Sequence, residues 1–238
     1  MSVAVIRAAF VALVFLTGAP AALADSPQDG AAPDSAFMDP AEAAPADAAP
    51  LVWHVRWDDA ITPVTVSFLA EATEQAAAAG AAALLVELDT PGGLLDATRD
   101  IVADLYRSPL PVIVWVGPSG ARAASAGVFI TMADHVAALA PGTNIGAASP
   151  VSMGGGGMDS TMAGKMFEDT AAFARAIAER RGRNAEWAEQ AVLKAESVTE
   201  SEALQLRVID LVENDVDELL AAVDGRTVEL PEGDHVVA

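Results

Sequence analysis

Two short apolar runs, each bounded by turn-forming residues, constrain the fold of this chain most strongly. The run AALLVEL covers residues 82–88, and the run PVIVWV covers residues 111–116. Continuous apolar runs of this length are typical of strands that are buried on both faces of a sheet. Between them lies a segment that we expect to be helical through Tyr106. Strands that alternate with helices predict an α/β fold with a mostly parallel sheet.

The same alternation is predicted over most of residues 51–238. A strand is expected at 51–57 and a helix from Pro63 to Gly80, because Thr62 followed by Pro63 is a typical helix start. Further helices are expected from about Ala123, from Met162 to Arg181, after Asn184, at the capping box of Thr199 and Glu202, and before a final strand at 227–230. Shorter strands are expected at 135–140, 143–149 and 207–212.

The first 24 residues have the pattern of a secretory signal peptide. Arg7 is followed by an apolar stretch from Ala8 to Leu16, and the residues ALA at 22–24 fit the small-x-small rule for cleavage. The alternative is an uncleaved membrane anchor. We therefore expect an exported protein that is periplasmic or otherwise extracytoplasmic.

Residues 25–50 differ in composition from the rest of the chain. They contain five prolines and six acidic residues but no Lys or Arg. Such a segment has too little apolar surface to offset the entropy of ordering it, so we expect a disordered acidic linker. The remaining residues 51–238 are long enough to form one domain with a sizeable core.

Charge and cysteine content exclude several classes of function. The formal net charge is −21, which is poorly suited to nucleic acid or to anionic lipid surfaces. Cysteine is absent, so thiol catalysis is excluded. No apolar run after residue 24 reaches the length that crosses a membrane. We expect neither a metal ion nor an organic cofactor.

The candidate site lies in loops that follow two consecutive buried strands. DTPGG at 89–93 follows the first strand, and GARAASAGVF at 120–129 places Ser125 among small residues after the second. The carboxyl ends of parallel strands are where active sites of α/β proteins collect. The glycines at 92 and 93 and the free N–H group of Ala126 at a helix start would suit an oxyanion hole. A plain tight turn is the alternative for the two glycines.

A serine nucleophile needs a base, and two residue types compete for that role. His54, His135 and His235 are all placed unfavourably by the expected topology. Lysine is scarce, because 11 of the 13 basic residues are Arg and only Lys165 and Lys194 are Lys. Lys165 opens the long helix in a small apolar setting that would favour its neutral amine. An exposed Lys165 that pairs with Asp169 is the alternative.

Five stretches of the sequence resemble one known family. They are ELDTPGG, SPLPVIVWVGPSGARAASAGVFI, APGTNIGAASPV, RRGRNAEWAEQAV and TESEALQLRVIDLV, and the resemblance as a whole covers roughly residues 50–225. In this order they resemble the NfeD-type membrane-associated serine proteases, whose soluble domain is ClpP-like and related to the crotonase superfamily. The resemblance implies a spiral of ββα units, self-association, and a Ser–Lys dyad that cleaves hydrophobic peptide segments.

The resemblance also implies a role for individual residues. Ser125 takes the position of the nucleophile, Lys165 that of the base, and Gly93 and Ala126 those of the oxyanion donors. Gly92, Arg122 and Ser149 are candidates for the substrate groove. Arg122 is equally an exposed loop residue, and Ser149 either assists Lys165 or simply stabilises a turn. The glycines at 154–157 form either a lid or a disordered loop.

The expected function is therefore an exported serine endopeptidase that acts on a hydrophobic substrate. The resemblance adds a stomatin- or prohibitin-like membrane protein as a partner, and a homo-oligomer. A non-catalytic oligomeric scaffold is the first alternative, and an acyl-thioester enzyme that binds coenzyme A is the second. Family members usually continue into transmembrane helices and a small β-barrel, which this sequence lacks up to Ala238, so membrane attachment stays open.

Overall fold

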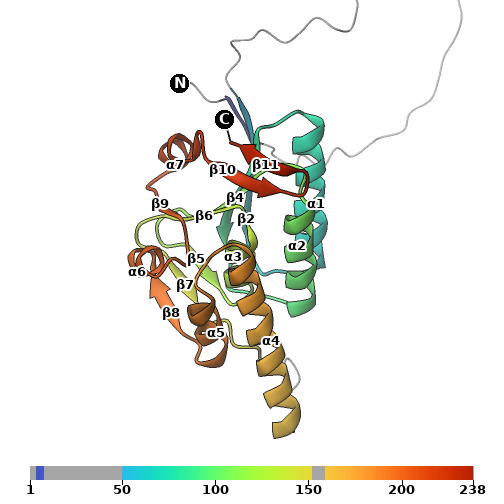
Figure 1. Cartoon of the computed structure of the whole chain (residues 1–238), viewed down its shortest axis with the longest axis vertical. Coiled ribbons are helices and arrows are strands. Elements are labelled where there is room, and N and C mark those ends of the chain that lie inside the picture. Colours follow the sequence, from blue (N-terminus) through green and yellow to red (C-terminus); the bar gives the residue numbers. More distant parts are fainter. Residues whose placement is uncertain (1–3, 8–49, 152–158, 238) are drawn as a thin grey trace, which may run out of the picture.

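A six-stranded sheet, parallel throughout, forms the centre of the protein. The structure is a computed structural model that describes residues 4–7, 50–151 and 159–237 (Figure 1). The order of the strands across the sheet is β1-β2-β3-β4-β6-β9. Their bounds are β1 Ala4–Arg7, β2 Leu51–Asp58, β3 Ala83–Asp89, β4 Val112–Val116, β6 Val136–Leu139 and β9 Leu211–Val212.

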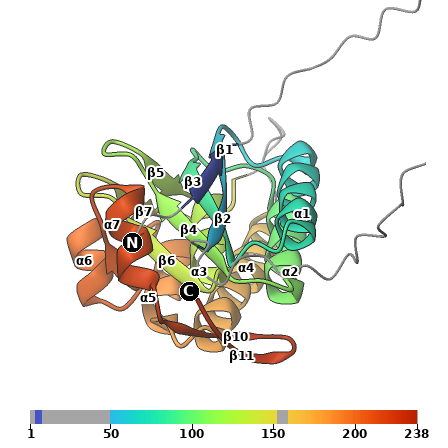
Figure 2. The ribbon, with the colours of Figure 1, turned by 90° about the horizontal axis from the view of Figure 1, so that it is seen from above.

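Helices connect the strands from β2 onward and pack around the sheet. Figure 2 shows α1 and α2 together at one side of the molecule, with α5, α6 and α7 at the opposite side. The long helix α4 extends beyond the body of the protein at its N-terminal end (Figure 1). The helices are α1 Pro63–Ala78, α2 Leu95–Arg107, α3 Ala126–Ala133, α4 Ser160–Arg180, α5 Ala185–Leu193, α6 Glu200–Gln205 and α7 Val216–Val223.

The core confirms the prediction of fully buried strands. All five residues of β4 are buried, and alternate side chains enter two separate apolar clusters. Val114 belongs to the larger cluster, whereas Ile113 and Trp115 belong to the other. Because successive side chains of a strand point to opposite faces, β4 is covered by apolar groups on both sides of the sheet.

The protein has a second, three-stranded sheet, and one of its strands lies where the start of a helix was predicted. The helix expected from about Ala123 begins at Ala126, because Arg122–Ala124 forms strand β5 and pairs in parallel with β7 (Asn144–Gly146). Strand β8 (Ser197–Thr199) completes this sheet and was not predicted. A short bridge between Thr90 and Ala123 attaches the small sheet to the end of β3.

In the C-terminal part, some predicted elements are confirmed and others are not. The capping box of Thr199 and Glu202 is present at the start of α6. The strand expected at 207–212 is shorter, because only β9 (Leu211–Val212) forms. The strand expected at 227–230 is present as β10 (Thr227–Leu230), and it forms an antiparallel hairpin with a strand that was not predicted, β11 (Gly233–Val236).

Several predictions fall mainly outside the described residues. The predicted signal peptide is described only at 4–7, which lies beside β2, and the predicted linker only at residue 50. The glycine loop at 154–157 is not described. Within the described ranges, no helix is both long and apolar enough to span a bilayer.

The end of helix α3 is fixed by a buried ionic cluster. Arg183 is only 9% exposed, and it donates to the carbonyl oxygens of Thr131 and Met132 at 3.0 and 2.6 Å. It also pairs with Asp134 at 2.8 Å and Asp210 at 2.7 Å. Burial lowers the pKa of Arg183, but the two carboxylates outweigh burial and raise it above the ordinary value. A charged Arg183 thus satisfies carbonyl groups that the helix end leaves unpaired.

We predict that Arg183→Met lowers the free energy of unfolding by about 3–5 kcal/mol, because it removes the cation of a buried ionic cluster and its hydrogen bonds to the end of α3. Burial already raises the pKa of Asp134 to about 7, so its carboxyl group would then take up a proton. Asp134 is fully buried, so water cannot replace the lost cation. Arg175→Met is the matched control, since Arg175 forms an exposed pair with Glu189 at 3.5 Å. Such surface pairs contribute about 0–1 kcal/mol. Urea denaturation of both variants measures the difference, and equal losses would contradict the account.

Candidate active site

Ser125 occupies a sharp turn between a strand and a helix. It follows β5 and precedes α3, and its backbone has φ 51° and ψ −108°. A positive φ is uncommon for residues other than glycine, and such strain is concentrated at functional sites. The N–H of Ser125 donates to the carbonyl of Gly146 at 3.0 Å, and its own carbonyl accepts from Val128 at 3.0 Å. The backbone is therefore held on both sides of the turn.

The first glycine of the DTPGG turn lies directly against Ser125. Gly92 has φ +113°, and a Cβ atom placed on it would lie 2.6 Å from the Cβ of Ser125 and 3.1 Å from its Oγ. The buried hydroxyl of Thr90 accepts the N–H of Gly92 at 3.2 Å and donates to the carbonyl of Asp59 at 2.8 Å. The conformation of the turn and its closeness to Ser125 both require glycine at position 92.

The second glycine directs its N–H group away from its strand partner. Ile61 donates to the carbonyl of Gly92 at 2.8 Å and accepts from the N–H of Leu94 at 2.9 Å. Because successive residues of an extended chain alternate in direction, the N–H of Gly93 faces the opposite side. It donates to none of the described residues, and neither does the N–H of Ala126 at the first position of α3.

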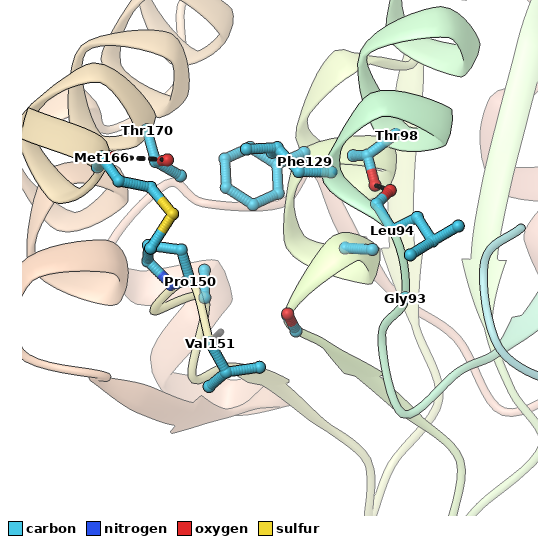
Figure 3. Close-up of a pocket in the computed structure, with 12 residues that line it drawn as sticks. Gly93, Leu94, Thr98, Phe129, Pro150, Val151, Met166 and Thr170 are labelled. Atoms are coloured by element: carbon cyan, nitrogen blue, oxygen red, sulfur yellow. Dashed lines mark hydrogen bonds between the residues drawn. The ribbon is translucent and has the colours of Figure 1, made fainter. Parts of the chain in front are cut away.

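Gly93, Ser125 and Ala126 line one pocket with a cavity volume of about 140 Å³ (Figure 3). Most of its wall is apolar, which suits an apolar side chain of a bound peptide. Phe129 projects from α3 between the helices, and Met166 and Thr170 of α4 lie across from it. The remaining lining residues are Leu94, Leu95, Thr98, Ala148, Pro150 and Val151.

The structure does not bring Lys165 into contact with Ser125. Lys165 is exposed on α4 and does not line the pocket, although the next residue, Met166, does. The alternative considered from the sequence, a pair between Lys165 and Asp169, is also not formed, because Asp169 pairs with Arg99 at 2.6 Å. The described residues that line the pocket include no ionisable side chain.

The other groove candidates are also placed away from the pocket wall. The hydroxyl of Ser149 donates to the carbonyl of Val192 at 2.6 Å, and none of the predicted groove residues, Gly92, Arg122 and Ser149, lines the cavity. The side chain of Arg122 is exposed, and its backbone N–H donates to the Oδ1 of Asp89 at 3.0 Å. Ser149 therefore has the role of a turn residue in this structure.

The three histidines lie outside the pocket in the described part of the chain. Nε2 of His54 lies 3.1 Å from Oε2 of Glu87, and His235 is exposed on β11. Nδ1 of His135 accepts the N–H of Val112 at 3.1 Å. Burial, together with the positive charges of Arg181 and Arg183, lowers the pKa of His135 from 6.5 to about 3. The prediction that no histidine serves Ser125 is consistent with these positions.

The pocket wall contains residues that sequence reasoning missed. Phe129 lies one helical turn after Ser125, and that spacing places both on the same side of α3. Met166 and Thr170 have the same spacing on α4. The spacing was visible in the sequence, but the pairing of these two helices across the pocket was not. The described residues contain no group of three His, Cys, Asp or Glu side chains able to hold a metal ion.

We predict that Gly92→Ala destabilises the protein more than Gly120→Ala. Gly120 also has a positive φ of +95°, but nothing lies within 4 Å of a Cβ placed there. It therefore reports the cost of the backbone conformation alone, about 1–2 kcal/mol. Crowding against Ser125 should add about 1–3 kcal/mol at position 92. Chemical denaturation of the two variants measures this difference, and equal destabilisation would mean that Gly92 does not press against Ser125.

A curated protein of known name resembles this chain in sequence. The Membrane-bound protease PH1510 of Pyrococcus horikoshii is 41% identical over 154 residues, which is 63% of this chain. The aligned part makes up 34% of that protein, so this chain spans about a third of its length.

Solved structures of a protease from the same organism resemble this chain in fold. The 1510-N membrane-bound stomatin-specific protease of Pyrococcus horikoshii, solved as a lysine-to-alanine mutant in complex with a substrate peptide, has a TM-score of 0.73 and 34% identity. The match covers 79% of this chain and 87% of that one. A serine-to-alanine mutant of the 1510-N protease gives a TM-score of 0.72 at 36% identity, over 77% of this chain and 89% of that one.

The ClpP-like fold is seen in a more distant structure. ClpP1 from Listeria monocytogenes has a TM-score of 0.55 at 18% identity, over 70% of this chain and 94% of that one. The fold is therefore α/β and ClpP-like, as predicted. Residues 51–226 match the family model described as NfeD1b, N-terminal domain. The chain thus belongs to the NfeD1b family and contains its N-terminal domain.

Proposed function

We propose that the protein is a serine endopeptidase whose nucleophile is Ser125. The observation that carries this proposal is the strained turn at Ser125, beside two N–H groups that have no partner among the described residues. The N–H groups of Gly93 and Ala126 border the same pocket as Ser125 and would receive the oxyanion of an attacked peptide. Each donor of this kind lowers the barrier by about 3–4 kcal/mol.

Lys165 is the proposed base, and its use requires a movement of α4. The lysine lies next to Met166 on the helix that forms one wall of the pocket. Residues 152–158, which precede α4, carry no ionisable side chain in the sequence. The side chains at 159–162 are exposed, so few contacts hold the first turn of α4 in place. Movement of this turn when a peptide binds would bring the amine toward Ser125.

The proposed reaction uses Lys165 twice. Its neutral amine takes the proton of Ser125 while Oγ attacks the peptide carbonyl, and the ammonium then protonates the leaving amine. Water next hydrolyses the acyl-enzyme, with Lys165 again as the base. The relatives support this assignment, because the Pyrococcus protease was solved as a serine and as a lysine mutant.

The substrate and the location are proposed on separate grounds. The apolar wall of the pocket supports a preference for hydrophobic peptide segments. The relative that is specific for a stomatin homologue supports a stomatin- or prohibitin-like membrane protein as the partner. The signal-peptide pattern at residues 1–24 supports export to the periplasm or another extracytoplasmic space. We further propose that the protein acts as a homo-oligomer.

A non-catalytic scaffold is the second candidate, because Lys165 does not touch Ser125 in this structure. Val151, which lines the pocket, is 80% exposed, and Met162, one turn before Met166 on α4, is 59% exposed. An exposed apolar rim of this kind also suits a surface that holds a partner without cleaving it. Ser125→Ala separates the candidates, since a scaffold would keep its partner binding and would have no activity to lose.

We expect Ser125→Ala and Lys165→Ala each to reduce cleavage of an apolar peptide library by at least about 1,000-fold, as removal of a nucleophile or base does in other serine proteases. Lys194→Ala is the matched control, because Lys194 is exposed at the end of α5. Product peptides are quantified by mass spectrometry. Unchanged cleavage in the Lys165 variant would remove the lysine from the mechanism.

The rate should also rise with pH, because only the neutral form of Lys165 accepts a proton. We expect kcat/KM for a neutral peptide to increase from pH 5 to pH 9. The residual activity of Lys165→Ala should lose this dependence. A flat wild-type profile over that range would contradict a lysine base.

A further inference from the structure

A second cavity lies at the far end of helix α3 from Ser125. Its volume is about 370 Å³, and the residues around it come from the ends of α2 and α4 and from the β10–β11 hairpin. The hairpin lies close to the C-terminus of the chain in Figure 1. The lining residues are Tyr106, Arg180, Arg181, Glu229, Leu230 and Pro231. Arg181 donates through Nε to the carbonyl of Ala133, the last residue of α3, at 2.8 Å.

Two guanidinium groups gather at this cavity around one aromatic ring. The Cζ atom of Arg180 lies 4.1 Å from the centroid of the Tyr106 ring, and that of Arg181 lies 5.3 Å from it. The ring thus holds two like charges close together through cation–π contacts. Within the described residues, neither arginine forms an ion pair with a carboxylate, although six other arginines do.

Two of the residues that line the cavity each carry a buried polar atom without a partner in the described part of the chain. These atoms are Nη2 of Arg181 and the hydroxyl oxygen of Tyr106. Buried polar groups are hydrogen-bonded in the great majority of cases, so this cluster has hydrogen-bonding capacity that the described residues do not use. A chain with 34 acidic and 13 basic residues has ample carboxylates, yet none pairs with this cluster among the described residues.

We propose that this cavity binds a phosphate group. Two guanidinium groups match the charge of a phosphate dianion, and each presents a planar set of N–H donors suited to its oxygens. Most of the lining is polar, and the ring of Tyr106 is the part of the cavity that the organic group of a phosphate monoester would contact. Free phosphate and a monoester share the chemistry that the two arginines recognise.

Glu229 gives this proposal a sharp test. Its carboxylate lines the same cavity without pairing with either arginine, so it repels a bound anion. Neutralising it should therefore strengthen the binding of phosphate, whereas a merely structural cluster would be indifferent. Glu232 lies in the turn of the same hairpin, is exposed and does not line the cavity. Glu232→Gln is thus the matched control for Glu229→Gln.

The experiment is isothermal titration calorimetry of the chain at constant ionic strength, with inorganic phosphate, phenyl phosphate and acetate as probes. We expect saturable binding of phosphate at one site per chain. Arg180→Gln should weaken it by about tenfold or more, because it removes charge-assisted hydrogen bonds. Glu229→Gln should strengthen it several-fold, while Glu232→Gln and Arg175→Gln leave it unchanged. Arg180 is exposed, so its substitution should not prevent folding.

The probes distinguish the sources of the phosphate group. Tighter binding of phenyl phosphate supports a monoester whose organic group contacts the Tyr106 ring, and equal affinities support free phosphate. Acetate that binds as tightly as phosphate would overturn the choice of a dianion. Absence of saturable phosphate binding, or binding that Arg180→Gln leaves intact, would overturn the site itself. None of these measurements uses peptide cleavage, so they stand apart from the proposed peptidase activity.

Discussion

The backbone turn at Ser125 is the constraint on which the candidate site depends. A residue with a side chain adopts φ 51° there, in the short step from β5 to α3. Its neighbours hold that conformation through hydrogen bonds with Gly146 and Val128 and through the close approach of Gly92. The strained turn exposes the N–H of Ala126 and places it on the same pocket as Gly93. The proposed oxyanion hole therefore depends on this turn for one of its two donors, the N–H of Ala126, while the turn at 92–93 supplies the other.

The opposite end of α3 shows how the fold sustains this strain. Arg181 and Arg183 bind the last carbonyl groups of the helix, and Asp134 connects Arg183 to the N–H of Val114 in β4. The helix is therefore anchored to the central sheet at its C-terminal end, while its N-terminal end carries Ser125. Because α3 is anchored at its far end, it can hold Ser125 in a fixed position.

The sequence predicted the sheet well because its strands are buried and their apolar runs are continuous. It missed β8, which is short and pairs with the distant β7, and β11, which pairs with β10 across a tight turn. It did not predict β1 either, which lies inside the predicted signal peptide. It also misplaced the start of α3, since only tertiary pairing with β7 makes Arg122–Ala124 a strand. Ser125 and the two glycines could be found from local motifs. The pocket wall of Phe129, Met166 and Thr170 could not, because it depends on how α3 and α4 pack. Lys165 came from scarcity and resemblance, and the structure leaves its amine away from Ser125.

A crystal structure of the Ser125→Ala variant with an apolar peptide bound would test the proposed site most directly. We predict that the carbonyl oxygen of the scissile bond lies about 2.7–3.1 Å from both the N–H of Gly93 and the N–H of Ala126. We also predict that the amine of Lys165 moves to within hydrogen-bonding reach of the position of the missing hydroxyl. A peptide bound elsewhere, or one bound in the pocket while Lys165 stays in solvent, would rule out the Ser125–Lys165 site.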